Sequence, residues 1–152
     1  MKSASNGSEG GRTFVLAFEP GEKVMEGLRR FAVEQNVRGA WLSGLGALRD
    51  AELGWLDTAS RSYVTRKFPD TMELVSLAGN VGRAGGEAAV HAHAALAGRD
   101  LAVVGGHLVE AVCAVTVEME VRETGFPLDR ALDGRFGLKL LDFGSERGAG
   151  SP

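Results

Sequence analysis

Alternation of apolar and polar residues is the most frequent pattern along this chain, and it predicts β-strands. The clearest case is residues 113–121, where Cys, Val, Val, Met and Val alternate with Ala, Thr, Glu and Glu. Residues 12–18 are also strand-like, with apolar Phe14, Leu16 and Phe18. Further short apolar segments bounded by turn residues are typical of strands, and they are 39–48, 51–56, 62–68, 72–78, 88–96 and 101–109.

One segment has the period of a helix instead. In residues 22–35, Val24, Leu28, Phe31 and Ala32 fall at positions i, i+4, i+7 and i+8, which places them on one apolar stripe. A single helix among many closely spaced strands predicts an α+β domain with a mainly antiparallel sheet. A doubly wound parallel sheet would need more crossover helices.

Two glycines interrupt the apolar segment 39–48. Gly44 and Gly46 indicate either a strand with a bend or bulge, or a loop that approaches another part of the molecule closely.

Length and composition favour one soluble domain. The chain has 152 residues, which is enough to bury a core without disulfides or structural metals. We expect a flexible N-terminal segment over residues 1–11, a single domain over 12–143 and a flexible C-terminal tail over 144–152. The N-terminus lacks the apolar stretch of a signal peptide, and the apolar run 108–117 contains Glu110 and is too short to span a bilayer. We therefore expect a cytoplasmic location and no membrane partner.

Net charge and cysteine content exclude several kinds of partner and site. Seventeen basic and 20 acidic side chains give a net charge of −3, which argues against tight nucleic-acid binding through one broad basic face, although a small local patch is compatible with it. The single cysteine, Cys113, excludes an intramolecular disulfide and a Cys-rich zinc site. Its place on the apolar side of its strand indicates a packed thiol.

The three histidines lie within 17 residues of one another. His91 and His93 are two positions apart, so on a strand both imidazoles share one face, about 7 Å apart along the backbone. If Gly98, Arg99 and Asp100 form a three-residue hairpin loop, Ala97 pairs with Leu101 and His91 lies opposite His107.

In that register the rings of His91, His93 and His107 converge. Three neutral imidazoles suit Zn²⁺, with a fourth position left for water or substrate, and other divalent transition metals also accept imidazole. The alternative is that the histidines are ordinary polar residues on a partly exposed strand face. A register shifted by one residue would turn His107 away, unless Gly105 and Gly106 form a bulge.

Glu73 is the candidate acid. It stands among apolar residues in segment 72–77, so burial near a metal could raise its pKa and make it a general acid or base. The alternative is an exposed strand carboxylate. Trp41 and Trp55 are expected in the core or in a subunit contact.

Several motifs in order resemble a known family. They are Gly11-Arg-Thr-Phe14, Glu19-Pro-Gly21, Ser43-Gly-Leu-Gly-Ala-Leu-Arg-Asp-Ala-Glu52, Glu73-Leu-Val-Ser-Leu-Ala-Gly79, His91-Ala-His93 and Gly105-Gly-His-Leu108. Over about residues 11–143 the chain resembles the plants-and-prokaryotes conserved (PPC) domain, a family often described as DNA-binding proteins with a PD1-like motif. It resembles the prokaryotic members better, because they carry the two histidine motifs.

The resemblance implies a compact α+β domain that assembles as a homotrimer, with His91, His93 and His107 as metal ligands. The fold is also similar to that of zinc-dependent acetolactate decarboxylases, an analogy of fold only. In plants the domain is paired with an Arg-Gly-Arg-Pro arm that enters the minor groove, and this chain has no such sequence. The plant motif Gly-Arg-Phe-Glu-Ile-Leu is replaced by Asp70-Thr-Met-Glu-Leu-Val75, which keeps only the Glu unchanged.

Three functions follow as hypotheses. The first is a homotrimeric zinc-binding module for a small molecule or for regulation. The second is a zinc-dependent lyase or hydrolase with Glu73 as the proton shuttle. The third is DNA binding, against which the net charge and the missing arm both argue.

Overall fold

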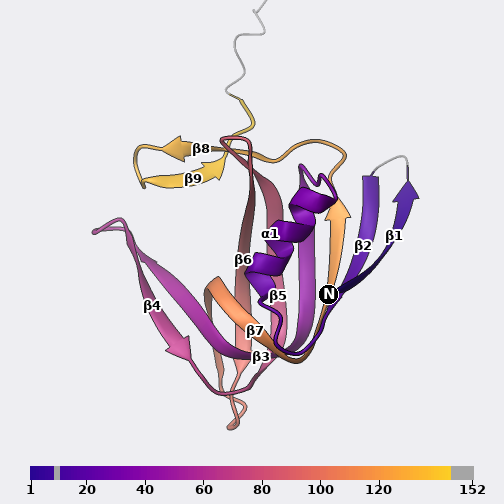
Figure 1. Cartoon of the computed structure of the whole chain (residues 1–152). Coiled ribbons are helices and arrows are strands. Elements are labelled where there is room, and N and C mark those ends of the chain that lie inside the picture. The colour runs from indigo at the N-terminus through magenta and orange to yellow at the C-terminus, as the bar shows by residue number, and fades with distance from the viewer. Residues whose placement is uncertain (9–10, 145–152) are drawn as a thin grey trace, which may run out of the picture.

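Long, bent antiparallel strands make up most of the molecule (Figure 1). The computed structural model describes residues 1–8 and 11–144. Its elements are β1 (Lys2–Ser8), β2 (Gly11–Phe18), α1 (Val24–Glu34), β3 (Ala40–Asp57), β4 (Ser62–Phe68), β5 (Met72–Ala84), β6 (Glu87–Ala97), β7 (Val103–Glu123), β8 (Asp129–Asp133) and β9 (Leu138–Leu141).

The sheet closes on itself at its centre. Its main path runs β1-β2-β7-β3-β5-β8-β9, and β6 pairs with both β5 and β7. Strands β3, β5, β6 and β7 therefore form a closed circuit of antiparallel pairs, while β4 extends from β3. This confirms the expected α+β class with a mainly antiparallel sheet.

Helix α1 packs against one face of this sheet, where it contacts β6 and β7 (Figure 1). Val24, Leu28, Phe31 and Ala32 are all buried, as the helical period predicts. The Phe31 ring packs edge-on against Phe14 with ring centroids 5.0 Å apart. The helix thus covers the apolar face of the sheet.

The start of α1 is fixed by a residue far away in sequence. The carboxylate of Glu110 on β7 accepts hydrogen bonds from the backbone N–H groups of Met25 (2.7 Å) and Glu26 (3.1 Å). A carboxylate satisfies the free N–H groups of a helix N-terminus and interacts favourably with its dipole. Glu110 therefore anchors the helix to the strand that also carries His107.

Several expected strands are joined in the structure. The segments 39–48 and 51–56 are both parts of β3, and 101–109 and 113–121 fall mostly in β7. The register of β3 against β5 shifts between Gly44 and Gly46, so these glycines mark a bulge in a strand. A Cβ at Gly46 would lie 2.2 Å from the carbonyl oxygen of Thr116, which shows how closely β7 approaches there.

The N-terminal segment differs from its prediction. Residues Lys2–Ser8 form β1 and pair with β2 over their whole length, although the sequence predicts a flexible segment over 1–11. Backbone pairing with β2 orders this segment, and such pairing needs no apolar alternation in the sequence. Lys2 adds an ion pair with Glu19 at 2.6 Å. Residues 9–10, and residues 145–152 of the predicted tail, lie outside the described residues.

The hairpin formed by β8 and β9 has no counterpart among the predicted strands. It follows β7, and β8 pairs in parallel with the end of β5. In Figure 1 it lies above β4 and beside the upper end of β6. No helix among the described residues is long and apolar enough to cross a membrane.

Candidate metal centre

The β6–β7 hairpin carries all three histidines, but its register differs from the predicted one. Ala97 pairs with Val103, and His93 lies opposite His107. The loop therefore spans five residues, 98–102, and Leu101 takes the left-handed backbone conformation with φ +62°. The Gly98 N–H donates to the Ala102 carbonyl, and the Leu101 N–H donates to the Gly98 carbonyl.

The predicted pairing of Ala97 with Leu101 is thus wrong by two positions. A shift of two keeps every side chain on its original face, because the strand period is two. His91, His93 and His107 still share one face of the hairpin, and the ring arrangement confirms that the three imidazoles converge.

The imidazoles lie in mutual contact range. Ring centroids are 5.2 Å apart for His91 and His93, 5.2 Å for His91 and His107, and 5.6 Å for His93 and His107. One ring nitrogen from each residue lies within 4.8 Å of the others. His91 and His107 are half-buried, while His93 is exposed.

The surroundings favour the neutral form of His91 and His107. Burial, together with the charges of Arg130 and the other two histidines, lowers the pKa of His91 to about 4. Burial and the neighbouring His93 also lower the pKa of His107. A neutral imidazole has a free lone pair, which is the form that binds a metal.

The hydrogen bonding of the cluster also fits a metal. Among residues 1–8 and 11–144, Nδ1 of His107 is buried and has no hydrogen-bond partner. An orphaned buried polar atom is costly unless a ligand satisfies it. Three converging imidazoles and an unsatisfied ring nitrogen match the donor set of a zinc or other divalent transition-metal site.

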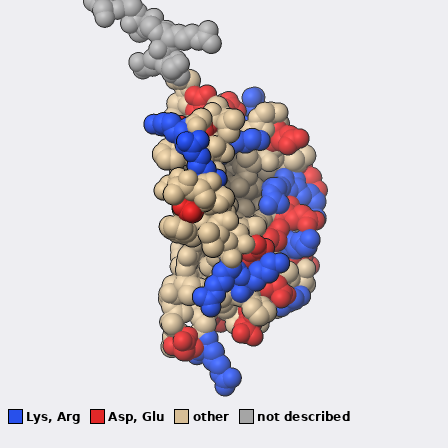
Figure 2. Space-filling model, turned by 90° about the vertical axis from the view of Figure 1, so that its left-hand side faces the viewer, with Lys and Arg blue, Asp and Glu red and all other residues tan. Residues whose placement is uncertain are grey.

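A pocket of about 250 Å³ opens beside the cluster, between β4, β6 and the β8–β9 hairpin. The Tyr63 ring lies 4.9 Å from the ring of His107. Figure 2 views this side of the molecule and shows a hollow in the upper half of the face, with blue Lys and Arg side chains near it. The lining residues are Tyr63, Ala84, Ala89, Val90, His91, His107, Arg130, Leu138, Lys139 and Leu140.

Arg130 is one of the pocket residues that sequence reasoning missed, as it also missed Tyr63 and Lys139. Arg130 comes from β8, whose short polar sequence gives no strand pattern, and tertiary packing brings it to the histidines. Its Nη2 donates to Oδ1 of the buried Asn80 at 2.6 Å, and Asn80 is the strand partner of His91.

The structure does not bring Glu73 to the cluster. Its side chain is exposed, and its strand partner on β6 is Ala97. Ala97 is four residues from His93, which is about 13 Å along a strand. Glu73 therefore stands at the other end of β5, and the alternative of an exposed strand carboxylate describes it.

The predictions for Cys113 and for the two tryptophans have different outcomes. Cys113 is fully buried, and burial raises the pKa of its thiol, in agreement with a packed role. Trp41 and Trp55 are 52% and 67% exposed, so neither belongs to the core of the chain.

Solved structures share this fold over nearly the whole chain. A plant- and prokaryote-conserved (PPC) protein from Pyrococcus horikoshii is 27% identical, with a TM-score of 0.82 and coverage of 95% of this chain and 96% of that one. A metal-containing protein from Archaeoglobus fulgidus is 30% identical, with a TM-score of 0.80 and coverage of 93% and 99%. A candidate DNA-binding protein from Bacteroides thetaiotaomicron is 20% identical, with a TM-score of 0.85 and coverage of 93% and 97%, and at that identity it shows the fold alone.

The sequence-level comparison gives the family directly. No curated protein matches the chain. The profile of the Plants and Prokaryotes Conserved domain (PCC or PPC) matches residues 5–125, which is most of the chain. This protein therefore belongs to the Plants and Prokaryotes Conserved domain family.

Proposed function

We propose that this protein binds one divalent transition metal, most simply zinc, through His91, His93 and His107, and acts as a metal-dependent module that binds a small molecule or serves regulation. The observation that carries the proposal is the convergence of three imidazole nitrogens within 4.8 Å. The relative from Archaeoglobus fulgidus, described as metal-containing, supports it at 30% identity. Zinc held by three histidines keeps a further position for water or a ligand, which it polarises as a Lewis acid.

The pocket favours a small-molecule ligand over a purely structural metal. Structural zinc sites are closed by four protein ligands. Here the described residues supply three histidines and no fourth His, Cys, Asp or Glu in the group. The pocket lined by His91 and His107 gives a ligand access to the same side chains.

A zinc-dependent lyase or hydrolase is the second candidate function, and Tyr63 is the observation that favours it. Its phenol lies in the pocket against His107, where it could hold or move a proton. Glu73 takes no part in this version, because it lies away from the cluster. Turnover of carbonyl or ester substrates that is lost in Tyr63→Phe, with the metal retained, would support an enzyme over a binding module.

We propose that three copies assemble through the outer face of the sheet. Val15, Leu45 and Val75 are each more than half exposed, and all three line one shallow concavity across β2, β3 and β5. Trp41 lies on the same side of β3 as Leu45, four residues away. Ser43, Ser76, Glu118 and Glu120 also line this concavity, so polar side chains lie among the apolar ones. Exposed apolar side chains gathered on one face are typical of an interface between protein subunits.

The charge distribution argues against DNA as the partner. Acidic and basic side chains are interspersed on the face in Figure 2, and the net charge is −3. We expect no electrophoretic shift of random or A·T-rich duplex at low salt. A shift at micromolar protein that weakens as salt is added would contradict this expectation.

Elemental mass spectrometry of the untagged protein tests the metal site. We expect about one zinc per chain in the wild type and loss of it in the double variant His91→Ala, His93→Ala. Glu73→Gln is the matched control, because it removes a candidate acid outside the cluster, and it should keep the metal. No metal in the wild type after incubation with zinc at neutral pH would overturn the proposed function.

A further inference from the structure

We propose that the pocket beside the histidine cluster is an anion site, in which Arg130 binds the carboxylate of a small organic ligand whose other end reaches the metal. This inference rests on the proposed metal site for one end of the ligand. The other end depends only on side chains that the structure describes.

Arg130 is a partly buried cation without a carboxylate partner. Its two hydrogen bonds go to neutral acceptors, the side chain of Asn80 at 2.6 Å and the Lys139 carbonyl at 2.9 Å. No Asp or Glu of the described residues forms a salt bridge with it. Burial also lowers the pKa of its guanidinium. An unpaired, partly desolvated charge is unfavourable, and an anionic ligand would offset that cost.

The same two hydrogen bonds hold the guanidinium in place. One anchor is the side chain of the 6% exposed Asn80, and the other is the backbone of β9. They use one N–H on each terminal nitrogen, and a guanidinium has five. The remaining donors match the planar, two-oxygen geometry of a carboxylate, and the fixed orientation lowers the entropy lost on binding.

The anchors also place Arg130 next to the cluster. Asn80 is the direct strand partner of His91, so the contact between Arg130 and Asn80 lies at the level of a metal ligand. Arg130, His91 and His107 line the same pocket. One small molecule can therefore touch the guanidinium and a metal held by the histidines.

The rest of the pocket favours a ligand that is small and negatively charged. Its lining contains two cations, Arg130 and Lys139, and no Asp or Glu, so the potential inside is positive. A bound divalent metal would make it more positive. The remaining walls are mainly Ala, Val and Leu side chains, which suit a short carbon chain between the carboxylate and the metal-binding group. A volume of about 250 Å³ limits the ligand to a small one.

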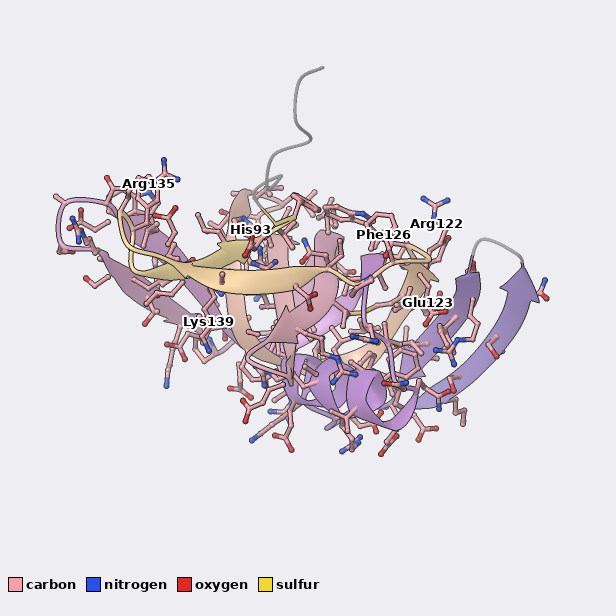
Figure 3. All side chains as sticks on the ribbon, turned by 90° about the horizontal axis from the view of Figure 1, so that it is seen from above. His93, Arg122, Glu123, Phe126, Arg135 and Lys139 are labelled. Carbon is pink, nitrogen blue, oxygen red and sulfur yellow. The ribbon has the colours of Figure 1, made fainter. Side chains whose placement is uncertain are left out.

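The hairpin that carries Arg130 also supplies a control residue. Figure 3 shows the β8–β9 hairpin crossing above the strand that carries His93, with Arg135 at its far end. Arg135 pairs with Asp133 at 2.7 Å and is 78% exposed, outside the pocket lining. Replacing Arg135 removes the same charge from the same hairpin without touching the pocket.

Two thiol probes test the inference by calorimetry on the zinc-loaded protein. Both 3-mercaptopropionate and its neutral amide offer a thiolate to zinc, but only the first has a carboxylate. We expect the carboxylate probe to bind the wild type at least tenfold more tightly than the amide. In Arg130→Gln this preference should fall below threefold while the affinity for the amide stays unchanged, and Arg135→Gln should keep the full preference.

The outcomes separate this inference from the proposed function. Equal affinity of the wild type for the two probes, with one zinc per chain, would overturn the anion site and leave the metal site standing. An undiminished preference in Arg130→Gln would overturn the role of Arg130. Absence of zinc binding by the wild type would overturn the proposed function itself. Arg130→Lys keeps the charge, so it should retain part of the preference for the carboxylate probe. If Arg130→Lys instead loses both this preference and binding of the amide, the substitution has damaged the whole pocket, and that result would contradict a direct role of Arg130 in binding the carboxylate.

Discussion

His93 on β6 and His107 on β7 are direct strand partners, with ring centroids 5.6 Å apart. The pairing makes the distance between two candidate ligands a property of the hairpin register. His91, two residues before His93, completes the cluster from the same face. Any change that moves β6 relative to its neighbours should therefore disturb the proposed metal site.

Gly79→Ala is expected to disturb it in this way. A Cβ at Gly79 would lie 2.3 Å from the carbonyl oxygen of His91 and 2.8 Å from Cα of Ala92, so β5 and β6 would have to separate. We expect a loss of about 1–3 kcal/mol in the free energy of unfolding and zinc affinity at least tenfold weaker. Denaturant unfolding and a competitive zinc titration measure the two effects.

Gly134→Ala is the control for this substitution. A Cβ at Gly134 meets nothing within 4 Å, so the change should leave both stability and zinc affinity nearly unaltered. A Gly79→Ala protein that binds zinc with wild-type affinity would show that the β5–β6 approach does not position the ligands.

Metal binding should stabilise the folded chain. The histidines come from two strands of one hairpin, so only the folded state presents them together. Free zinc at one hundred times its dissociation constant should add about 2.7 kcal/mol to the free energy of unfolding. Thermal unfolding with zinc, and again after addition of a chelator, measures this gain, and the double variant His91→Ala, His93→Ala should show none. Equal stabilisation of that variant would place the zinc elsewhere.

The histidine cluster was predictable because it depends on parity more than on exact register. Residues 91 and 93 share a face on any strand, and every even shift of the hairpin keeps His107 on that face. The loop length was not predictable, because the left-handed conformation of Leu101 is unusual for a branched apolar residue. The error of two positions in the register therefore did not affect the predicted convergence of the three histidines.

Glu73 and Arg130 show the limit of the same reasoning. Glu73 stands in an apolar segment, but its alternation places it on the exposed side of β5. Arg130 reaches the pocket only through the packing of β8 against β5, a tertiary contact that leaves no local pattern in the sequence. Local periodicity gives the face of a residue, but not which distant element covers that face.

The Arg12–Glu123 pair predicts a specific pH dependence of stability. The guanidinium of Arg12 donates to both carboxylate oxygens of Glu123, at 2.9 and 2.6 Å, and joins β2 to the end of β7. The hydrogen bonds from this guanidinium hold the pKa of Glu123 below its usual value. The folded state therefore binds a proton at Glu123 less readily than the unfolded chain does.

The sign of the effect follows from that difference. The stabilisation is complete at neutral pH, and it is lost as the pH falls from about 4.3, the usual pKa of an unfolded glutamate, through the lowered pKa of the folded state. Glu123→Gln should cost about 1 kcal/mol at pH 7, a modest figure because Arg12 is partly exposed. The difference from wild type should shrink towards pH 3 in denaturant titrations. Glu34→Gln, in an exposed pair with Arg30, should cost much less, and a cost for Glu123→Gln that is constant with pH would contradict the ion pair.

The apolar outer face of the sheet gives the last prediction. Leu45 is 57% exposed and Val75 is 55% exposed, and they line the same concavity as Val15. If three chains meet there, light scattering should give a mass about three times the 16.0 kDa of one chain. Leu45→Glu would place a charge in the interface, where burial without a partner is costly, so this variant should dissociate to monomers. Val33→Glu is the matched control, because Val33 is 61% exposed on α1, outside that concavity, and this variant should remain a trimer. A monomeric wild type at micromolar concentration, or a trimeric Leu45→Glu variant, would show that the outer face serves another purpose.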